Sequence, residues 1–178
     1  IVRDQPNLAT IDPLVRTSCL REVHLENTAV SGLGALSDLW EIGGLTLIDN
    51  PNLTAVGPLR SELRLHGPVD VRANDALTEL SGLAALDEIN RSLHFGSDLT
   101  NVYRETANVR CVPVQPSEDF DHQTLPTWVR IGDNDALTRL GELQWQLVDG
   151  DITLRGNDAL TGLEGLDRLE TVNGSLRI

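Results

Sequence analysis

The sequence predicts a mainly β fold, a β-solenoid of about seven rungs of about 24 residues each, on three observations. The phrase Asn-Asp-Ala-Leu-Thr begins at Asn74 and recurs at Asn134 and Asn157. Apolar residues keep the same spacing between the copies. Hydrophobic residues make up 40% of the chain and aromatic residues only 3%, which suits an aliphatic core of near-identical layers. A fixed period of this size is typical of stacked repeats.

Each rung is predicted to begin with a short strand. Polar and apolar residues alternate there, as in the pairs Leu45/Leu47 and Ile152/Leu154, which indicates one buried face. Stacking one strand per rung gives a parallel sheet. The expected strand starts, at intervals of 22, 24, 24, 36, 23 and 24 residues, are Val23, Leu45, Val69, Leu93, Val129, Ile152 and Leu176.

The residues after each strand predict the other sides of the rung. An asparagine turns the chain, and its amide is expected to stack on the next rung's asparagine as a ladder of Asn50, Asn74, Asn134 and Asn157. A Gly-Leu-x-x-Leu-x-x-Ile/Val segment follows, as in Gly82 to Ile89. Its spacing by three predicts a short helical or 3₁₀ turn, or a bent third side.

The single long interval locates an insertion. Residues 103–127 break the repeat and contain three prolines and an acidic run, which indicates a surface loop. We therefore expect one solenoid domain over residues 1–178 with a loop insertion at 103–127. Because the chain opens and stops within rungs, we also expect it to be a fragment of a longer protein.

Charge and composition narrow the class of protein. The net charge is −13, and all 14 basic residues are arginines. Such an acidic surface repels phosphate backbones and anionic lipid, so we expect no nucleic-acid partner. No apolar run approaches ~18 residues, so we expect no membrane insertion by this segment. No motif calls for a cofactor or a metal.

Cys19 and Cys111 are the only cysteines, and their spacing fits no metal motif. Cys19 lies four residues before the strand start at Val23, where other rungs place Ile89 or Val148. It is therefore either a buried core thiol or the partner of Cys111 in a disulfide. A disulfide would favour a secreted protein.

The rung pattern resembles a known family. The best copy reads Gly-x-Ile-x-Leu-x-x-Asn-x-x-Leu-x-x-Leu-x-Gly-Leu-x-x-Leu-x-x-Val from Gly150 to Val172. This pattern resembles the receptor L domain and is most similar to the bacterial and fungal surface proteins that carry the same repeat. The resemblance implies a right-handed β-solenoid, displayed outside the cell, that binds a protein or glycan and has no catalytic site. The alternative is a leucine-rich-repeat horseshoe with a period of about 22 residues.

The first candidate site is the solvent face of the strands. The middle residue of each strand is predicted to point outward, and two arginines follow just beyond the strands. A flat polar platform of this kind suits a polar or anionic epitope. These residues are His24, Thr46, Asp70, His94, Arg130, Thr153 and Arg177, with Arg72 and Arg155 beyond the strands.

Two further candidates come from acidic residues. The insertion carries Glu118, Asp119, Asp121 and His122, and Trp128 lies at its end, where its ring could stack on a sugar. Ca²⁺ takes several oxygen ligands, but the run lacks the glycine and alternation of an EF-hand loop. The loop is thus either hydrated or a recognition element. A column of Asp75, Asp135 and Asp158 reads as solvated turn carboxylates or a cation site.

The predicted function is an extracellular or cell-surface, non-catalytic recognition module for a protein or glycan. One alternative is a structural spacer or assembly module. Another is a carbohydrate-active β-helix enzyme, which needs paired carboxylates in a groove, and the only tempting pair of acid and base is Asp70 with His94. No nucleophile elbow, zinc-protease motif or phosphate loop is present.

Overall fold

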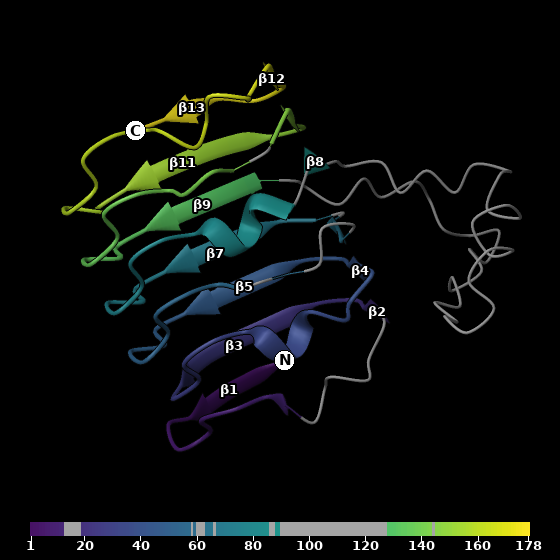
Figure 1. Cartoon of the computed structure of the whole chain (residues 1–178), viewed down its shortest axis with the longest axis vertical. Coiled ribbons are helices and arrows are strands. Elements are labelled where there is room, and N and C mark those ends of the chain that lie inside the picture. The colour runs from purple at the N-terminus through teal and green to yellow at the C-terminus, as the bar shows by residue number, and fades with distance from the viewer. Residues whose placement is uncertain are drawn as a thin grey trace, which may run out of the picture.

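The computed structural model describes residues 1–12, 19–57, 59, 63–65, 67–85, 88–89, 128–143 and 145–178. Within them the chain winds as a β-solenoid of parallel strands with almost no helix (Figure 1). The predicted fold class is confirmed. The solenoid has about five turns, slightly fewer than the about seven rungs expected.

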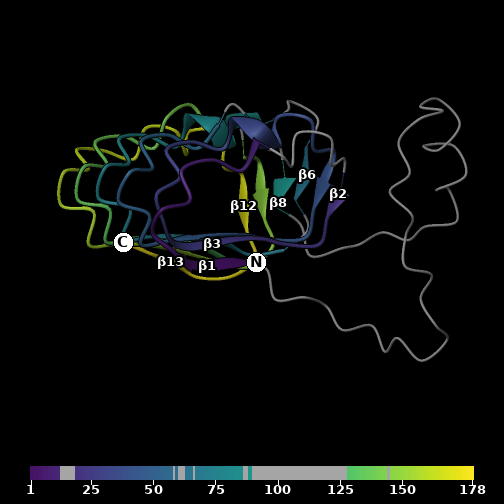
Figure 2. The ribbon, with the colours of Figure 1, turned by 90° about the horizontal axis from the view of Figure 1, so that it is seen from below.

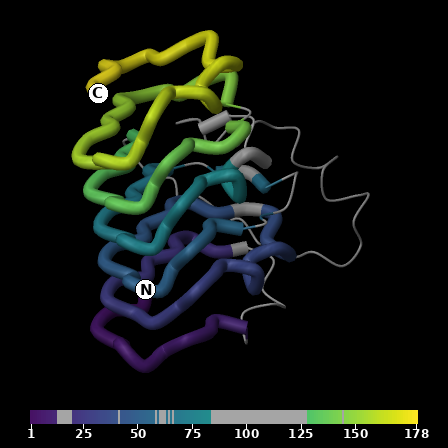
Figure 3. The backbone as a smooth tube through the Cα atoms, turned by 60° about the vertical axis from the view of Figure 1, so that its left-hand side comes forward, coloured from purple at the N-terminus to yellow at the C-terminus, as the bar shows by residue number. Residues whose placement is uncertain are grey.

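Strands from successive windings of the chain form a seven-stranded parallel sheet, here called the long sheet. Its strands follow one another up the molecule in chain order, as the successive coils of the tube show (Figure 3). In spatial order they are β1 (Val2–Gln5), β3 (Val23–Thr28), β5 (Leu45–Ile48), β7 (Val69–Arg72), β9 (Trp128–Gly132), β11 (Asp151–Arg155) and β13 (Leu176–Arg177).

A second parallel sheet of six two-residue strands, the short sheet, closes another side of the coil (Figure 2). Where the sequence predicts helical turns or a bent side, two 3₁₀ helices precede it, η2 (Gly34–Leu36) and η3 (Ser81–Ala85). The short strands are β2 (Cys19–Leu20), β4 (Glu41–Ile42), β6 (Arg64–Leu65), β8 (Glu88–Ile89), β10 (Leu147–Val148) and β12 (Thr171–Val172).

The strand order corrects one expected strand. β7 pairs directly with β9, with Val69 opposite Val129, so a strand starting at Leu93 has no place between them. Leu93 itself lies outside the described residues, and the intervals of 24 and 36 residues together separate the paired Val69 and Val129. The seventh strand of the long sheet is β1 instead, which pairs with β3 through Val2 and Leu25.

The register of the short sheet corrects the placement of Cys19. Cys19 pairs with Glu41, and Leu20 pairs with Ile42 in the column that continues to Val148. Leu20 thus takes the position expected for Cys19, because the first two turns have one residue fewer between the short and long strands. Cys111 lies outside the described residues, and the predicted alternatives of core thiol and disulfide stay predictions.

The asparagine ladder is confirmed. The backbone N–H and the side-chain Nδ2 of Asn50 each donate to Oδ1 of Asn74, both at 3.1 Å. Asn74 donates in the same way to Asn134, sixty residues later, and Asn134 to Asn157. Each Nδ2 also donates to a strand carbonyl of the preceding turn, as Asn74 does to Leu47 at 2.9 Å. Asn50, Asn74 and Asn134 are at most 1% exposed.

The residue before each ladder position takes a left-handed backbone conformation. Its φ is 52° at Asp49, 53° at Ala73 and 53° at Asp133. Asp and Asn tolerate this region better than other side chains, which explains most of these positions but not Ala73. The turn that the sequence assigns to the asparagine therefore begins one residue earlier.

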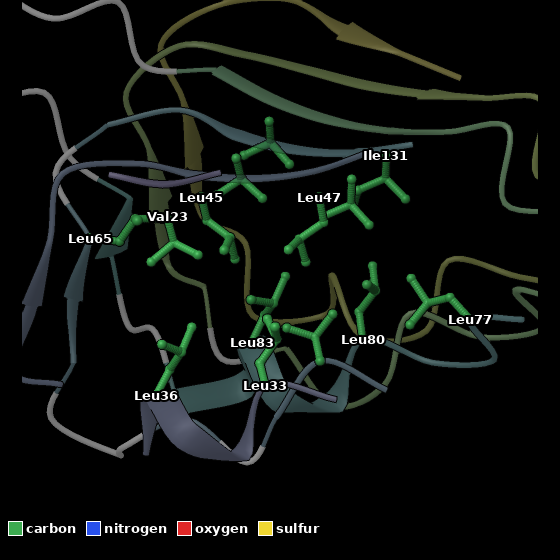
Figure 4. Close-up of a cluster of buried hydrophobic side chains, with 14 of the residues drawn as sticks. Val23, Leu33, Leu36, Leu45, Leu47, Leu65, Leu77, Leu80, Leu83 and Ile131 are labelled. Atoms are coloured by element: carbon green, nitrogen blue, oxygen red, sulfur yellow. The ribbon is translucent and has the colours of Figure 1, made fainter. Parts of the chain in front are cut away.

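Aliphatic side chains from all sides fill the coil interior. Leu45 and Leu47 of the long sheet meet Leu33, Leu80 and Leu83 of the opposite side (Figure 4). Successive turns add equivalent side chains to one continuous core, as stacked repeats require. Among the described residues, one aromatic side chain joins it: Trp145 is 1% exposed and donates its Nε1–H to the carbonyl of Leu83 at 3.2 Å.

Close stacking leaves no space for a side chain at Gly82. A Cβ added there would overlap the backbone carbonyl of Val56 in the preceding turn, whereas a Cβ at Gly34 meets no atom within 4 Å. Backbone atoms cannot move aside without shifting a whole turn. Alanine at either position restricts the unfolded backbone, but only alanine at Gly82 meets a neighbouring turn. Comparing the two substitutions therefore separates the cost of crowding from the effect on backbone entropy.

We predict that Gly82→Ala lowers the free energy of unfolding by about 1–3 kcal/mol, the usual cost of overpacking. Gly34→Ala should be neutral or slightly stabilising, because alanine restricts the unfolded chain. Urea denaturation of both variants and the wild type measures the difference. Equal stability of the two variants would contradict the close approach of the turns at Gly82.

Candidate functional site: the outer face of the long sheet

The candidate site is the side of the long sheet opposite the core, here called the outer face. Core residues such as Val129 and Ile131 alternate with residues that point outward. Strand register stacks these residues into two main columns. The central column is His24, Thr46, Asp70, Arg130, Thr153 and Arg177, and the flanking column is Arg3, Glu26, Ile48, Arg72, Gly132 and Arg155.

The sequence-predicted face residues that the structure describes are thus brought together on one surface. Arg72 and Arg155 end their strands rather than following them, so they belong to the face itself. Trp128, predicted as part of the insertion, is the first residue of β9 and stands opposite Asp151 at the border of the same face. His94 and the loop residues Glu118, Asp119, Asp121 and His122 lie outside the described residues.

At the N-terminal end of the face, His24 is covered by its neighbours. It is only 7% exposed, although it was expected to face solvent. Glu26 Oε2 lies 3.0 Å from both Arg3 Nε and His24 Nε2, and Glu22 Oε1 lies 3.4 Å from His24 Nδ1. The long Arg3 and Glu26 side chains account for the burial, and they tie β1 to β3.

In the middle of the face, Asp70 is also covered, at 5% exposure. Arg72 binds it bidentately, with Nε donating to Oδ1 at 2.6 Å and Nη2 donating to Oδ2 at 3.0 Å. This hydrogen bonding to Asp70 raises the pKa of the Arg72 guanidinium above its ordinary value, and burial opposes it less strongly. Asp70 is therefore a structural counter-ion, and its neighbour across the register is Arg130.

The C-terminal half of the face is more open. Arg130 and Arg155 are exposed, and Trp128 and Thr153 are half-buried. The Arg130 guanidinium carbon lies 5.1 Å from the centroid of the Trp128 ring, a cation–π contact. Across the described part of the chain, neither Arg130 nor Arg155 has an ion-pair partner.

The last two strands are joined by Asp151. Its Oδ1 accepts the backbone N–H of Ser175 at 2.8 Å, and its Oδ2 lies 3.4 Å from Arg177 Nη1. The Ser175 hydrogen bond, more than the charge of Arg177, lowers the pKa of the Asp151 carboxyl below 3.8. Asp151 thus holds β13 to β11 as a carboxylate.

The Asp column does not gather into a metal centre. Asp75, Asp135 and Asp158 are exposed on the turns. No group of three or more His, Cys, Asp or Glu side chains able to hold a metal ion occurs among the residues that the structure describes.

Sequence reasoning missed the partners that cover His24 and Asp70. Arg3 and Glu26 belong to the flanking column, of which only Arg72 and Arg155 are predicted from the sequence as face residues. The outward direction of these two side chains could be predicted in part from the sequence. Val2-Arg3 has the apolar–polar alternation of a strand, and Glu26 comes directly after the core residue Leu25. The charge pairing between strands needed the register, which only the structure supplies.

Comparison with family models, with curated proteins and with solved structures finds no match to this chain. Over the described residues, the structure contains no helix with the length and apolar character needed to cross a membrane.

We predict that the hold of Asp151 on β13 is complete above pH 3.8 and is lost as the pH falls below that value. The sign follows because the folded-state pKa lies below the unfolded one, so protonation favours the loosened strand. NMR titration of the Ser175 amide should give a midpoint below 3.8, and Asp151→Asn should abolish the transition. A midpoint at or above 3.8 would contradict this assignment.

Proposed function

We propose that this domain is a non-catalytic binding module that recognises a protein or glycan through the outer face of the long sheet, outside the cell or on its surface. The observation that carries the proposal is that no other described element crosses the outer face (Figure 2). The repeat's resemblance to receptor L domains supports the extracellular setting. The repeat pattern is also similar to that of leucine-rich-repeat proteins, and this alternative family likewise implies a binding role.

The face suits recognition because it is formed before any ligand arrives. Its strands are fixed in register along the whole sheet, and the asparagine ladder holds the turns beside them. A rigid surface loses little conformational entropy on binding, so more of the contact energy becomes affinity. Between the charged side chains, the half-buried Thr46, Ile48 and Thr153 project less far from the sheet.

The state of Asp70 supports a non-catalytic role. A glycosidase needs two carboxyl groups that reach the substrate, one of them able to donate a proton. Both oxygens of Asp70 are taken by Arg72, and the residue is 5% exposed. Its register neighbour Arg130 is a cation rather than the predicted His94, which removes the tempting pair from adjacent strands.

The difference between the charge of the outer face and that of the whole chain supports a protein or glycan partner over a nucleic acid. The chain carries a net charge of −13, yet the two columns of the outer face hold five arginines against Glu26 and Asp70. The acidic surplus therefore lies on other surfaces and repels polyanions such as nucleic acid. The face itself accepts neutral or mildly anionic ligands.

The proposal predicts that bulky substitutions on the face abolish binding. A panel of immobilised extracellular proteins and glycans supplies the ligand. Thr46→Arg and Thr153→Arg should lower the affinity for any ligand found in it by about tenfold or more. Thr138→Arg, on an exposed residue of another side of the coil, is the matched control. Surface plasmon resonance compares the four proteins. Equal binding by the face variants and the control would refute recognition through this face.

A further inference from the structure

We propose that the C-terminal half of the outer face binds the carboxylate-bearing end of a glycan, through Trp128, Arg130, Thr153 and Arg155. This inference rests on the proposed function and names the ligand class of the same face. It uses the four residues of β9 and β11 that the rest of the face leaves uncovered.

Unpaired charge is the first argument. Elsewhere on the face the arginines have acidic partners, with Arg3 beside Glu26, Arg72 on Asp70 and Arg177 beside Asp151. Arg130 and Arg155 are exposed and lack such partners across the described chain. In a chain with a net charge of −13, two adjacent cations without a counter-ion favour an external anion.

Spacing is the second argument. Arg130 stands opposite Thr153, and Arg155 lies two residues farther along the adjacent strand on the same side. Strands lie about 4.8 Å apart and two residues span about 6.6 Å, so the two Cα atoms are about 8 Å apart. Arginine side chains are long enough for both guanidinium groups to converge on one carboxylate between them. Thr153 is the register partner of Arg130 and lies two residues before Arg155 on the same side of the strand.

Orientation is the third argument. The Trp128 ring holds the Arg130 guanidinium at 5.1 Å from its centroid, which limits the freedom of the arginine. A stacked guanidinium keeps its N–H edge free to donate, and its fork matches the two oxygens of a carboxylate. The same half-buried indole offers apolar area to the C–H face of a sugar ring.

The donor and acceptor inventory favours a sugar over an acidic peptide. The patch offers guanidinium N–H donors and one hydroxyl, whereas the neighbouring carboxylates are already engaged, Asp70 by Arg72 and Asp151 by Ser175 and Arg177. A peptide brings backbone N–H groups that need acceptors, while sugar hydroxyls accept as well as donate. The acidic remainder of the chain further favours a single carboxylate over a polyanion.

The test is a binding titration with an oligosaccharide that ends in glucuronic acid, followed by NMR at the Trp128 indole N–H and the Thr153 amide. We expect saturable shifts, and binding about tenfold weaker or worse for the matched oligosaccharide that ends in glucose. Arg130→Gln and Arg155→Gln should each lower the affinity for the glucuronic-acid oligosaccharide by a similar factor. Arg168→Gln, an exposed arginine away from the face, should bind like wild type.

Three results would overturn the inference. The first is equal binding of the two sugars, and the second is a loss of affinity in Arg168→Gln as large as in Arg130→Gln and Arg155→Gln. The third is binding of a peptide with one glutamate but not of the glucuronide. The outcome is separable from that of the proposed function. If Thr46→Arg and Thr153→Arg lose panel ligands that Arg130→Gln and Arg155→Gln retain, the face binds but not by this chemistry. If no face variant changes binding, both proposals fail.

Discussion

The asparagine ladder is the interaction on which the rest of the structure depends. Each ladder asparagine accepts at Oδ1 from the backbone N–H and the side chain of the residue in the turn before it, the Thr28 hydroxyl in the case of Asn50 and an asparagine amide in the others. Its Nδ2 donates to a strand carbonyl. These groups are buried, and a buried polar group without a partner costs about 1–3 kcal/mol. A turn displaced by one residue would orphan several of them at once. The ladder therefore favours one register and excludes its neighbours, and it adds to the burial of one strand face, which also opposes a one-residue shift.

The outer face follows from that register. Because side chains alternate along a strand, a shift of one residue would exchange core and surface along the whole turn. With the register held, residues sixty positions apart, such as Asp70 and Arg130, become neighbours. The face divides accordingly into an N-terminal part whose charges are mutually satisfied and a C-terminal part in which Arg130 and Arg155 have no ion-pair partner among the described residues. The turns carry the exposed carboxylates of Asp75, Asp135 and Asp158, so these acidic groups and the arginines of the face lie on different surfaces of the coil.

The repeat period predicts the strands, the ladder and the parallel sheet, because each depends on local residues that recur in phase. The period fails at Leu93, because β7 pairs directly with β9 although the sequence around Leu93 is a plausible copy of the strand pattern, and nothing local distinguishes that copy from a true strand. It also fails at Cys19, where one residue fewer shifts Leu20 into the column. The burial of His24 and Asp70 depends on Arg3, Glu26 and Arg72 in neighbouring columns, and such lateral contacts leave no mark in the spacing.

The most direct test of the account is a nuclear Overhauser measurement on protein labelled at asparagine. The stacked ladder predicts a cross-peak between the backbone amide proton of Asn74 and the side-chain amide protons of Asn134. The Asn74 N–H donates to Asn134 Oδ1 at 3.1 Å, and Nδ2 of Asn134 is bonded to the same carbon as that oxygen. Matching peaks should join Asn50 to Asn74 and Asn134 to Asn157. The absence of the Asn74–Asn134 peak, with Asn74 instead contacting a residue about 24 positions later, would contradict the direct stacking of these turns.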